Sequence, residues 1–435
     1  MNEWTLALVA LALLGVAAVS RRLSGTSVTP AMVFVAFGLI VGREGLDGVD
    51  LASSGATVRG LAEATLALVL FADASRIDLR QLRPSVGVPL RLLGIGLPLT
   101  IAAGTAAAAA LFGELSIQEA LILAIVLAPT DAALGQSVVT DERVPERIRE
   151  GLNVESGLND GICVPLLFAA VAAADVQSEI AAGRSPGTLL VEEIGYGVLC
   201  GVAVGVLIAL IVREAGRRDL IARPWRQVIP AAGAALAYGS ATGLGGSGFI
   251  AAFVAGIAFR IALARDPEEM NRLTEEVGGV LNGATFVLFG AVLLGPALAD
   301  MSARMLVYAL LSLTLLRMVP VAVAMLGSHA RAPTVAFLGW FGPRGLASIV
   351  FAVTVVQESQ LPHEQLLTLV VYLTVGISIA GHGISAVPLA ARYGRWFSRH
   401  PDGRAPAMES APSDVTRPRH HLWSAASSAV DRRRQ

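Results

Sequence analysis

Ala128-Pro129-Thr130-Asp131 interrupts a long apolar segment at 117–137, and Gly342-Pro343-Arg344-Gly345 interrupts a second one at 335–357. Proline removes a backbone donor and clashes with the preceding helical turn, so both segments are expected to be broken helices. Broken ends expose unpaired N–H and C=O groups that carry partial charges. Asp131 is placed to neutralise facing helix N-termini, and Arg344 to neutralise helix C-termini.

The composition around these breaks is that of a membrane protein. Hydrophobic residues make up 54% of the 435 residues and charged residues 15%, against about 25% charged in an ordinary soluble chain. A membrane helix needs roughly 20 apolar residues. The sequence therefore predicts an all-α polytopic membrane protein with about 13 transmembrane helices. The segments are 4–20, 28–42, 60–75, 86–112, 117–137, 150–174, 188–212, 227–243, 247–264, 277–299, 303–327, 335–357 and 365–391.

The arginines predict the orientation of these segments. All 33 basic residues are arginine. Most of them lie in loops after odd-numbered segments or in the C-terminal tail. The positive-inside rule then places the odd loops and the C-terminus in the cytoplasm and the N-terminus outside, in a bacterial plasma (inner) membrane. The arginines in or beside even-numbered loops are Arg43, Arg59, Arg184 and Arg304.

The two breaks also predict the domain organisation. They lie seven segments apart, which fits two six-helix repeats, segments 1–6 and 8–13, with the seventh segment as a linker. Because seven is odd, the second repeat is inverted relative to the first, and the breaks meet near the midplane. Residues 1–395 are expected to form the transmembrane domain. Residues 396–435, rich in Pro, Ser and Arg, are expected to be a disordered cytoplasmic tail.

The segment at 150–174 carries a polar stripe, Glu155-Ser156-Gly157-Leu158-Asn159-Asp160. Ser156 and Asp160 share one helix face, and Glu155 and Asn159 share the neighbouring face. Such groups can simply hold membrane helices together. An acid is a poor choice for that purpose, however, and ionisable groups inside a bilayer usually mark function. The other ionisable groups well inside segments are Asp73, Asp131, Arg317 and Arg344.

Several other classes of function find no support. The net charge of −1 indicates no nucleic-acid partner. Cys163 and Cys200 define neither a disulfide framework nor a metal spacing. No cofactor and no enzymatic activity are predicted. His382 in the last segment could sense pH, although a lone histidine is more often structural.

Taken together, these motifs resemble the NhaP-type cation/proton antiporters, which are related to the eukaryotic sodium/proton exchangers. The resemblance spans roughly residues 5 to 395. It is carried by Pro129-Thr130-Asp131, by Glu155-Ser156 with Asn159-Asp160, by Ser247-Gly248-Phe249 through Gly256, and by Gly342-Pro343-Arg344-Gly345. Arg317 also falls where the family carries an arginine.

The resemblance implies a core at about 86–175 and 303–391, in which segments five and twelve cross, and a dimer (scaffold) domain at about 1–85 and 188–299. It implies that Asp160 binds both the ion and the proton. Thr130, Ser156 and Asp131 would be further Na⁺ ligands, and Asn159 would support the site. It also implies a homodimer. Two further roles follow: Glu155 would pair with Arg317, and Arg344 would be structural at the crossing.

The chemistry of Asp160 fits this family. Desolvation pushes a carboxylate near the midplane toward its neutral form, while nearby donors or cations favour its charged form. When these two effects on the carboxylate are balanced, Asp160 binds either a proton or a cation, but not both at once. We therefore expect electroneutral 1:1 exchange of Na⁺ (or Li⁺) for H⁺ by alternating access. The absence of lysine supports electroneutrality, because electrogenic relatives carry a core lysine. The alternatives are K⁺/H⁺ antiport on the same scaffold, a cation channel, for which we see no filter loop, and a regulatory sensor.

Overall fold

The computed structural model describes residues 3–23, 25–42, 55–76, 87–131, 133–174, 186–263, 267–358, 361–400 and 406–410. Every regular element within these ranges is a helix. Seven of the described helices are long and apolar enough to cross a membrane by length and composition, and four more are shorter apolar helices. The prediction of an all-α polytopic membrane protein is confirmed.

The first seven predicted segments each coincide with helical structure. In chain order these are α1 (Glu3–Leu23), α2 (Pro30–Val41), α3 (Gly55–Arg76), the run α5 (Gly87–Arg91), η2 (Leu92–Gly96) and α6 (Leu97–Leu111), the pair α7 (Ile117–Val126) and α8 (Gln136–Val139), α9 (Glu146–Ala174) and α11 (Pro186–Arg217).

The remaining six predicted segments also coincide with helical structure. They are α13 (Val228–Gly243), α14 (Gly248–Leu263), the run α15 (Glu268–Leu288), η3 (Phe289–Leu294) and α16 (Gly295–Ala299), the pair α17 (Ala303–Leu313) and α18 (Leu315–Ala324), the pair α19 (Ala332–Trp340) and α20 (Leu346–Glu358), and α21 (Glu364–Ser398). Two short helices, α12 (Arg223–Arg226) and α22 (Ala407–Ser410), complete the described elements.

Both predicted breaks are present. Segment five stops being helical after Val126 and resumes only at the four-residue helix α8, and segment twelve is non-helical between Trp340 and Leu346. The helix α7, which leads into the first break, begins with a side-chain cap. Ser116 and Glu119 form a reciprocal capping box at the start of α7, which satisfies two donors that the first turn of a helix leaves unpaired.

Three segments expected to be single regular helices are irregular instead. Segments four and ten each contain a π-helical turn, η2 and η3, just before Pro98 and Pro296. A proline cannot donate the regular helical hydrogen bond, so the turn before it widens. Segment eleven is divided at Thr314, whose hydroxyl donates to the Leu310 carbonyl at 2.6 Å. A side chain that bonds the carbonyl four residues back bends a helix.

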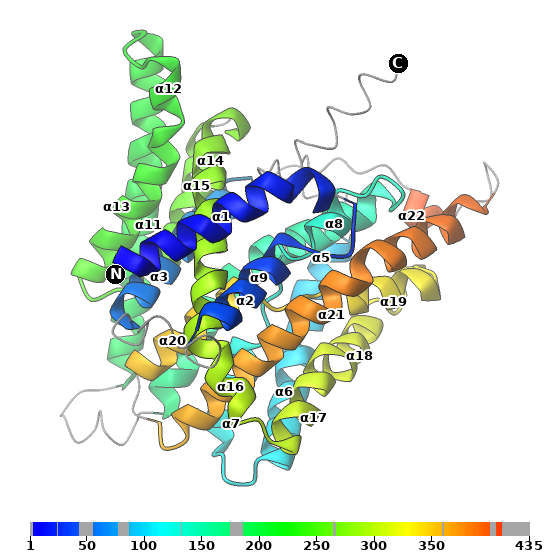
Figure 1. Ribbon diagram of the computed structural model, residues 1–435. Helices are drawn as coiled ribbons and strands as arrows, with labels where there is room; N and C mark the ends of the chain where they lie inside the picture. Colours follow the sequence, from blue (N-terminus) through cyan, green and yellow to red (C-terminus); the bar gives the residue numbers. More distant parts are fainter. Residues whose placement is uncertain are drawn as a thin grey trace.

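The helices pack in two groups; Figure 1 shows α11, α13 and α14 of the first at the upper left, and α17, α18 and α21 of the second at the lower right. In the first group, α3, α11, α13 and α14 share one apolar cluster. A Cβ at Gly197, Gly201 or Gly205 of α11 would overlap α14, so these glycines let the two helices approach closely. In the second group, α6, α7 and α9 pack with α17, α18, α20 and α21 around the two breaks.

Two described stretches of the predicted tail are helical. The helix α21 continues to Ser398, and the short helix α22 contacts α9. Glu409 is 2% exposed. It accepts hydrogen bonds from the Arg331 backbone N–H (2.9 Å) and the Thr334 hydroxyl (2.6 Å) at the start of α19. A helix start needs such acceptors, and this one finds its partner in the tail. Residues 411–435 lie outside the described part of the chain.

Candidate functional site

The two broken segments meet, and each contributes the charge that caps the other. The Asp131 backbone N–H donates to the Pro343 carbonyl at 2.7 Å. The Asp131 carboxylate accepts from the Leu346 N–H at the start of α20 (3.1 Å). In return, the Arg344 guanidinium donates to the carbonyls of Ala128 and Pro129, just after α7. Opposite charges thus lie at helix ends whose partial charges they neutralise.

Beside this crossing, α9 and the break in segment five form a cluster of neutral oxygens. The Thr130 and Ser156 hydroxyls are 2.8 Å apart, and the Asn159 side-chain amide donates to the Thr130 hydroxyl at 2.8 Å. All three residues are buried. The Asn159 side-chain oxygen is buried and has no hydrogen-bond partner among the described residues. A buried acceptor without a donor is costly unless it is satisfied by water or an ion, so this cluster can accept a small cation.

Close to the oxygen cluster there is a buried ion pair between Arg317 and Glu155. Arg317 of α18 contacts both carboxylate oxygens of Glu155, at 2.6 Å and 2.8 Å, and both side chains are 2% exposed. Two parallel N–H···O contacts of this kind are the strongest geometry for such a pair. The pair joins α9 to α18. It therefore links the helix that carries Asn159 and Asp160 to the second half of the chain.

Gly342 lies between the ion pair and the oxygen cluster, so a larger side chain at this position would press on both. A Cβ there would lie 2.7 Å from the Arg317 Nε and 3.1 Å from the Thr130 methyl carbon. Gly342→Ala is therefore expected to destabilise the protein by about 1–3 kcal/mol and to weaken cation binding. Thermal unfolding in detergent measures the first effect. Gly239→Ala is the matched control, because a Cβ at Gly239 would meet nothing within 4 Å. Equal stability of the two variants would contradict this packing.

Asp160 and Asp131 line a cavity between the two helix groups. Asp160 is 8% exposed. On the opposite wall lie residues of α2, α3 and α15, including Asp73. A Cβ at Gly157 would lie 3.4 Å from the Asp73 Cβ, so Asp73 approaches the polar stripe of α9. Asp73 was noted as an ionisable intramembrane residue but was not included in the predicted site. The proximity of Asp73 to the polar stripe of α9 is seen only in three dimensions, because a single sequence does not give the distance between them.

A second cavity continues the first. The two share Thr29, Pro30, Ala133, Leu134 and Gln136, and the second is also lined by Asp141 and Arg143 in the loop between α8 and α9. Because the two cavities share these residues, together they reach from Asp160 to the loop after segment five. This loop and the first turn of α9 carry Arg143, Arg147 and Arg149, and we call this end of the bundle the arginine-rich end.

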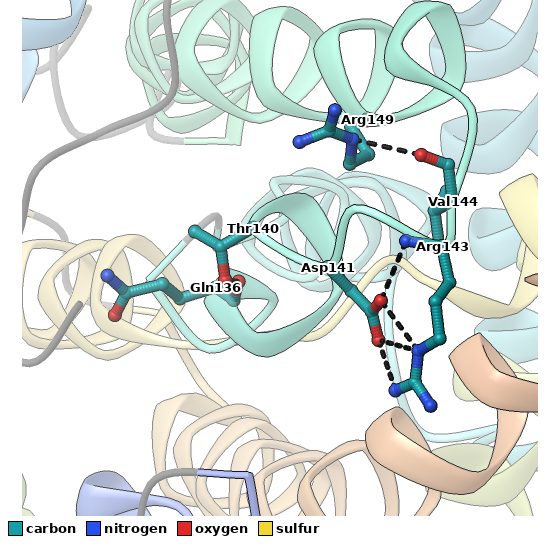
Figure 2. A network of polar contacts seen from close by, with 6 residues as sticks. All are labelled: Gln136, Thr140, Asp141, Arg143, Val144 and Arg149. Atoms are coloured by element: carbon teal, nitrogen blue, oxygen red, sulfur yellow. Dashed lines mark hydrogen bonds and ion pairs between the residues drawn. The ribbon is translucent and has the colours of Figure 1, made fainter. Parts of the chain in front are cut away.

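Figure 2 shows this loop, in which the Asp141 carboxylate accepts from the Arg143 backbone N–H (3.0 Å) and from its guanidinium (2.6–3.2 Å). Burial raises the pKa of Asp141, but the hydrogen bonds from Arg143 and the charges of Arg143 and Arg149 outweigh it and hold the pKa below its ordinary value of 3.8.

Because the folded-state pKa of Asp141 is depressed, its ionised form contributes stability above the unfolded pKa, and this contribution is lost as pH falls through the folded pKa. Asp141→Asn is therefore expected to lower the unfolding temperature at pH 7. The difference from the wild type should shrink as the pH is lowered below about 4. Unfolding curves at several pH values check this. A difference that does not change with pH would exclude a role for the Asp141 charge.

The fold and the site together define a class: a multi-span helical membrane protein in which two broken helices cross beside a buried carboxylate. Residues 8–392 match the family described as "Sodium/hydrogen exchanger, transmembrane". The chain belongs to this family, a family of transporters rather than enzymes.

Curated relatives and solved structures agree with this assignment. The K⁺/H⁺ antiporter NhaP2 of Shewanella oneidensis is 25% identical over 367 residues, 82% of this chain and 62% of the relative. A Na⁺/H⁺ antiporter of Schizosaccharomyces pombe is 32% identical over 155 residues, covering 34% of this chain and 33% of the relative. The chain thus spans less than two thirds of the length of these relatives.

The similarity in fold extends over nearly the whole chain. The structure of the sodium proton antiporter MjNhaP1 from Methanocaldococcus jannaschii at pH 8 matches with a TM-score of 0.73 and 20% identity. The match covers 90% of this chain and 99% of MjNhaP1.

Proposed function

We propose that the protein is a monovalent cation/proton antiporter in which Asp160 binds the cation and the proton by turns. The observation that carries this proposal is the position of Asp160, a nearly buried carboxylate that lines a cavity. It lies on α9 with Ser156 and Asn159, whose side chains bond Thr130 of the break in segment five. A carboxylate in such a place is stable when a proton or a cation neutralises it.

The ligand set of the proposal combines charged and neutral oxygens. Asp160 supplies the charge, and Thr130 and Ser156 supply hydroxyl oxygens. Asp131 is a further ligand, and Asn159 holds Thr130 in place through its amide N–H. Hard oxygen ligands of this kind suit small monovalent cations. Asp73, on the opposite wall of the cavity, adds negative potential that favours entry of a cation.

Transport follows from motion between the two helix groups. The core, at about 86–175 and 303–391, carries the broken helices, and the scaffold, at about 1–85 and 188–299, forms the homodimer. With the arginine-rich end in the cytoplasm, the cavity gives an inward-facing state. Movement of the core against the scaffold would expose Asp160 to the other side.

A single titrating carboxylate beside a neutral amide predicts one cation exchanged for one proton, without net charge movement. Na⁺, or Li⁺, is the first candidate cation. K⁺ is the second, and the observation that favours it is that the Shewanella relative is named a K⁺/H⁺ antiporter.

Exchange in proteoliposomes with an internal pH dye tests the proposal. We expect a gradient of Na⁺ to drive proton flux in the opposite direction, at a rate that does not respond to an imposed membrane potential. The same assay with Li⁺ and K⁺ identifies the cation. Absence of cation-driven proton flux with all three ions would overturn the proposed function, and a strong response to the potential would overturn electroneutrality.

A further inference from the structure

The break in segment twelve takes backbone groups out of the regular hydrogen bonds of its two helices. The Trp340 carbonyl, at the end of α19, accepts from the Gly342 N–H within the break (2.9 Å) and keeps a second lone pair, and the Arg344 N–H precedes α20. An unpaired N–H at membrane depth costs several kcal/mol, so a neighbouring element has to supply partners to the break. The neighbour is α21, a helix of 35 residues that packs against both α19 and α20.

Ser378 and His382 of α21 supply these partners. The Arg344 N–H donates to the Ser378 hydroxyl oxygen at 2.7 Å, and the His382 Nε2 lies 2.9 Å from the Trp340 carbonyl oxygen. The His382 Nδ1 is 3.1 Å from the Ser378 hydroxyl. Ser378 and His382 are one helical turn apart, so they reach both ends of the break from one face of α21.

The contacts of the His382 ring depend on its tautomer. With a proton on Nε2, the ring donates to the Trp340 carbonyl, which can only accept, and Nδ1 can accept from the Ser378 hydroxyl, whose oxygen accepts from the Arg344 N–H. Nδ1 also lies 3.0 Å from the Ser378 backbone carbonyl oxygen, an acceptor that it does not bond in this tautomer.

We propose that Ser378 and His382 are positioning residues for the cation site. This proposal rests on the proposed function. By fixing both ends of the break, they fix Gly342, which packs against the Thr130 methyl group and Arg317, and they fix Arg344, which holds the carbonyls of Ala128 and Pro129 beside Thr130. A shift of the break therefore moves an oxygen of the site, although neither positioning residue touches the cation.

Substitutions of His382 separate its two contacts. His382→Gln places an amide N–H near the position of Nε2 and keeps the bond to the Trp340 carbonyl. His382→Asn reaches only the level of Nδ1 and loses that bond. Ser378→Ala removes the link to Arg344. Ser385→Ala is the matched control, because Ser385 also lies on α21 and accepts from the Trp340 indole N–H at 2.9 Å without touching the backbone of the break.

The readout is the cation concentration that gives half-maximal thermal stabilisation of the purified full-length protein, together with the KM and kcat of exchange. We expect Ser378→Ala and His382→Asn to raise the half-maximal concentration and KM about tenfold, the effect of one lost buried hydrogen bond. His382→Gln and Ser385→Ala should stay close to the wild type.

Two results would overturn the proposal. One is an unchanged half-maximal concentration and KM per folded protein in Ser378→Ala and His382→Asn. The other is His382→Gln behaving like His382→Asn. If Ser378→Ala does not fold, the comparison of His382→Gln with His382→Asn still decides. Loss of the proposed function has a different signature, since the wild type itself would then show no cation-driven proton flux.

Discussion

Exchange is expected to fall to the level of protein-free vesicles when Asp160 is replaced with asparagine. Asparagine has nearly the same shape but carries neither the negative charge that holds a cation nor the proton that is exchanged for it. The other carboxylate of the proposed ligand set, Asp131, accepts from the Ala133 and Leu346 backbone N–H groups at the crossing, so we expect that it does not replace Asp160. Cation-driven proton flux in proteoliposomes measures the effect.

The control for this substitution is Asp300→Asn, an exposed aspartate after α16, which should exchange like the wild type. Thermal unfolding establishes that both variants are folded. Measurable exchange by folded Asp160→Asn, above the vesicle background, would show that the site has been assigned to the wrong residue.

The second large effect is expected for the Glu155–Arg317 ion pair. Glu155→Gln leaves a buried guanidinium without its counter-charge, and removing one partner of a buried pair costs about 3–5 kcal/mol. We expect a loss of that size in the free energy of unfolding. The double variant Glu155→Leu/Arg317→Met should recover most of it, because both charges are then removed and the volume is filled.

Denaturant unfolding of the wild type, of Glu155→Leu, of Arg317→Met and of the double variant forms a complete cycle. The pair interaction is supported if the double variant is more stable than either single variant. If the losses of the two single variants simply add, the two side chains act independently and do not hold α9 and α18 together.

Much of the fold follows from the sequence, because the bilayer imposes a simple length requirement. Twenty apolar residues span its core, and every predicted segment coincides with helical structure. The breaks were predictable for a local reason: Pro129 and Pro343 each lie within two residues of a charged residue in an apolar run. Neither conclusion needs knowledge of which helices touch.

The irregular features depend on details that hydrophobicity does not report. The π turns precede Pro98 and Pro296, which lack a backbone donor, and the division at Thr314 follows from its hydroxyl bonding the Leu310 carbonyl. The packing of α22 arises from a distant partner, since Glu409 satisfies backbone and hydroxyl donors at the start of α19. The composition of residues 396–435 suggests disorder because it contains no sign of that partner.

In the candidate site, too, some features follow from the sequence and others only from the packing of the helices. Helical spacing placed Glu155, Ser156, Asn159 and Asp160 on neighbouring faces of one helix, and the structure brings Thr130 against Ser156 and Asn159. Spacing says which face a residue occupies but not what lies opposite. Asp73 across the cavity and the link from Ser378 and His382 to the break therefore emerge only from the packing of the helices.

Proton release on cation binding tests the central claim most directly. Purified protein in weakly buffered detergent solution is mixed with Na⁺, and in a parallel experiment with K⁺, while a pH dye records protons. If Asp160 holds a cation and a proton by turns, the transported cation releases up to one proton per protein molecule from the wild type and none from Asp160→Asn. Saturable cation binding without proton release in the wild type, or equal release from Asp160→Asn, would contradict the account.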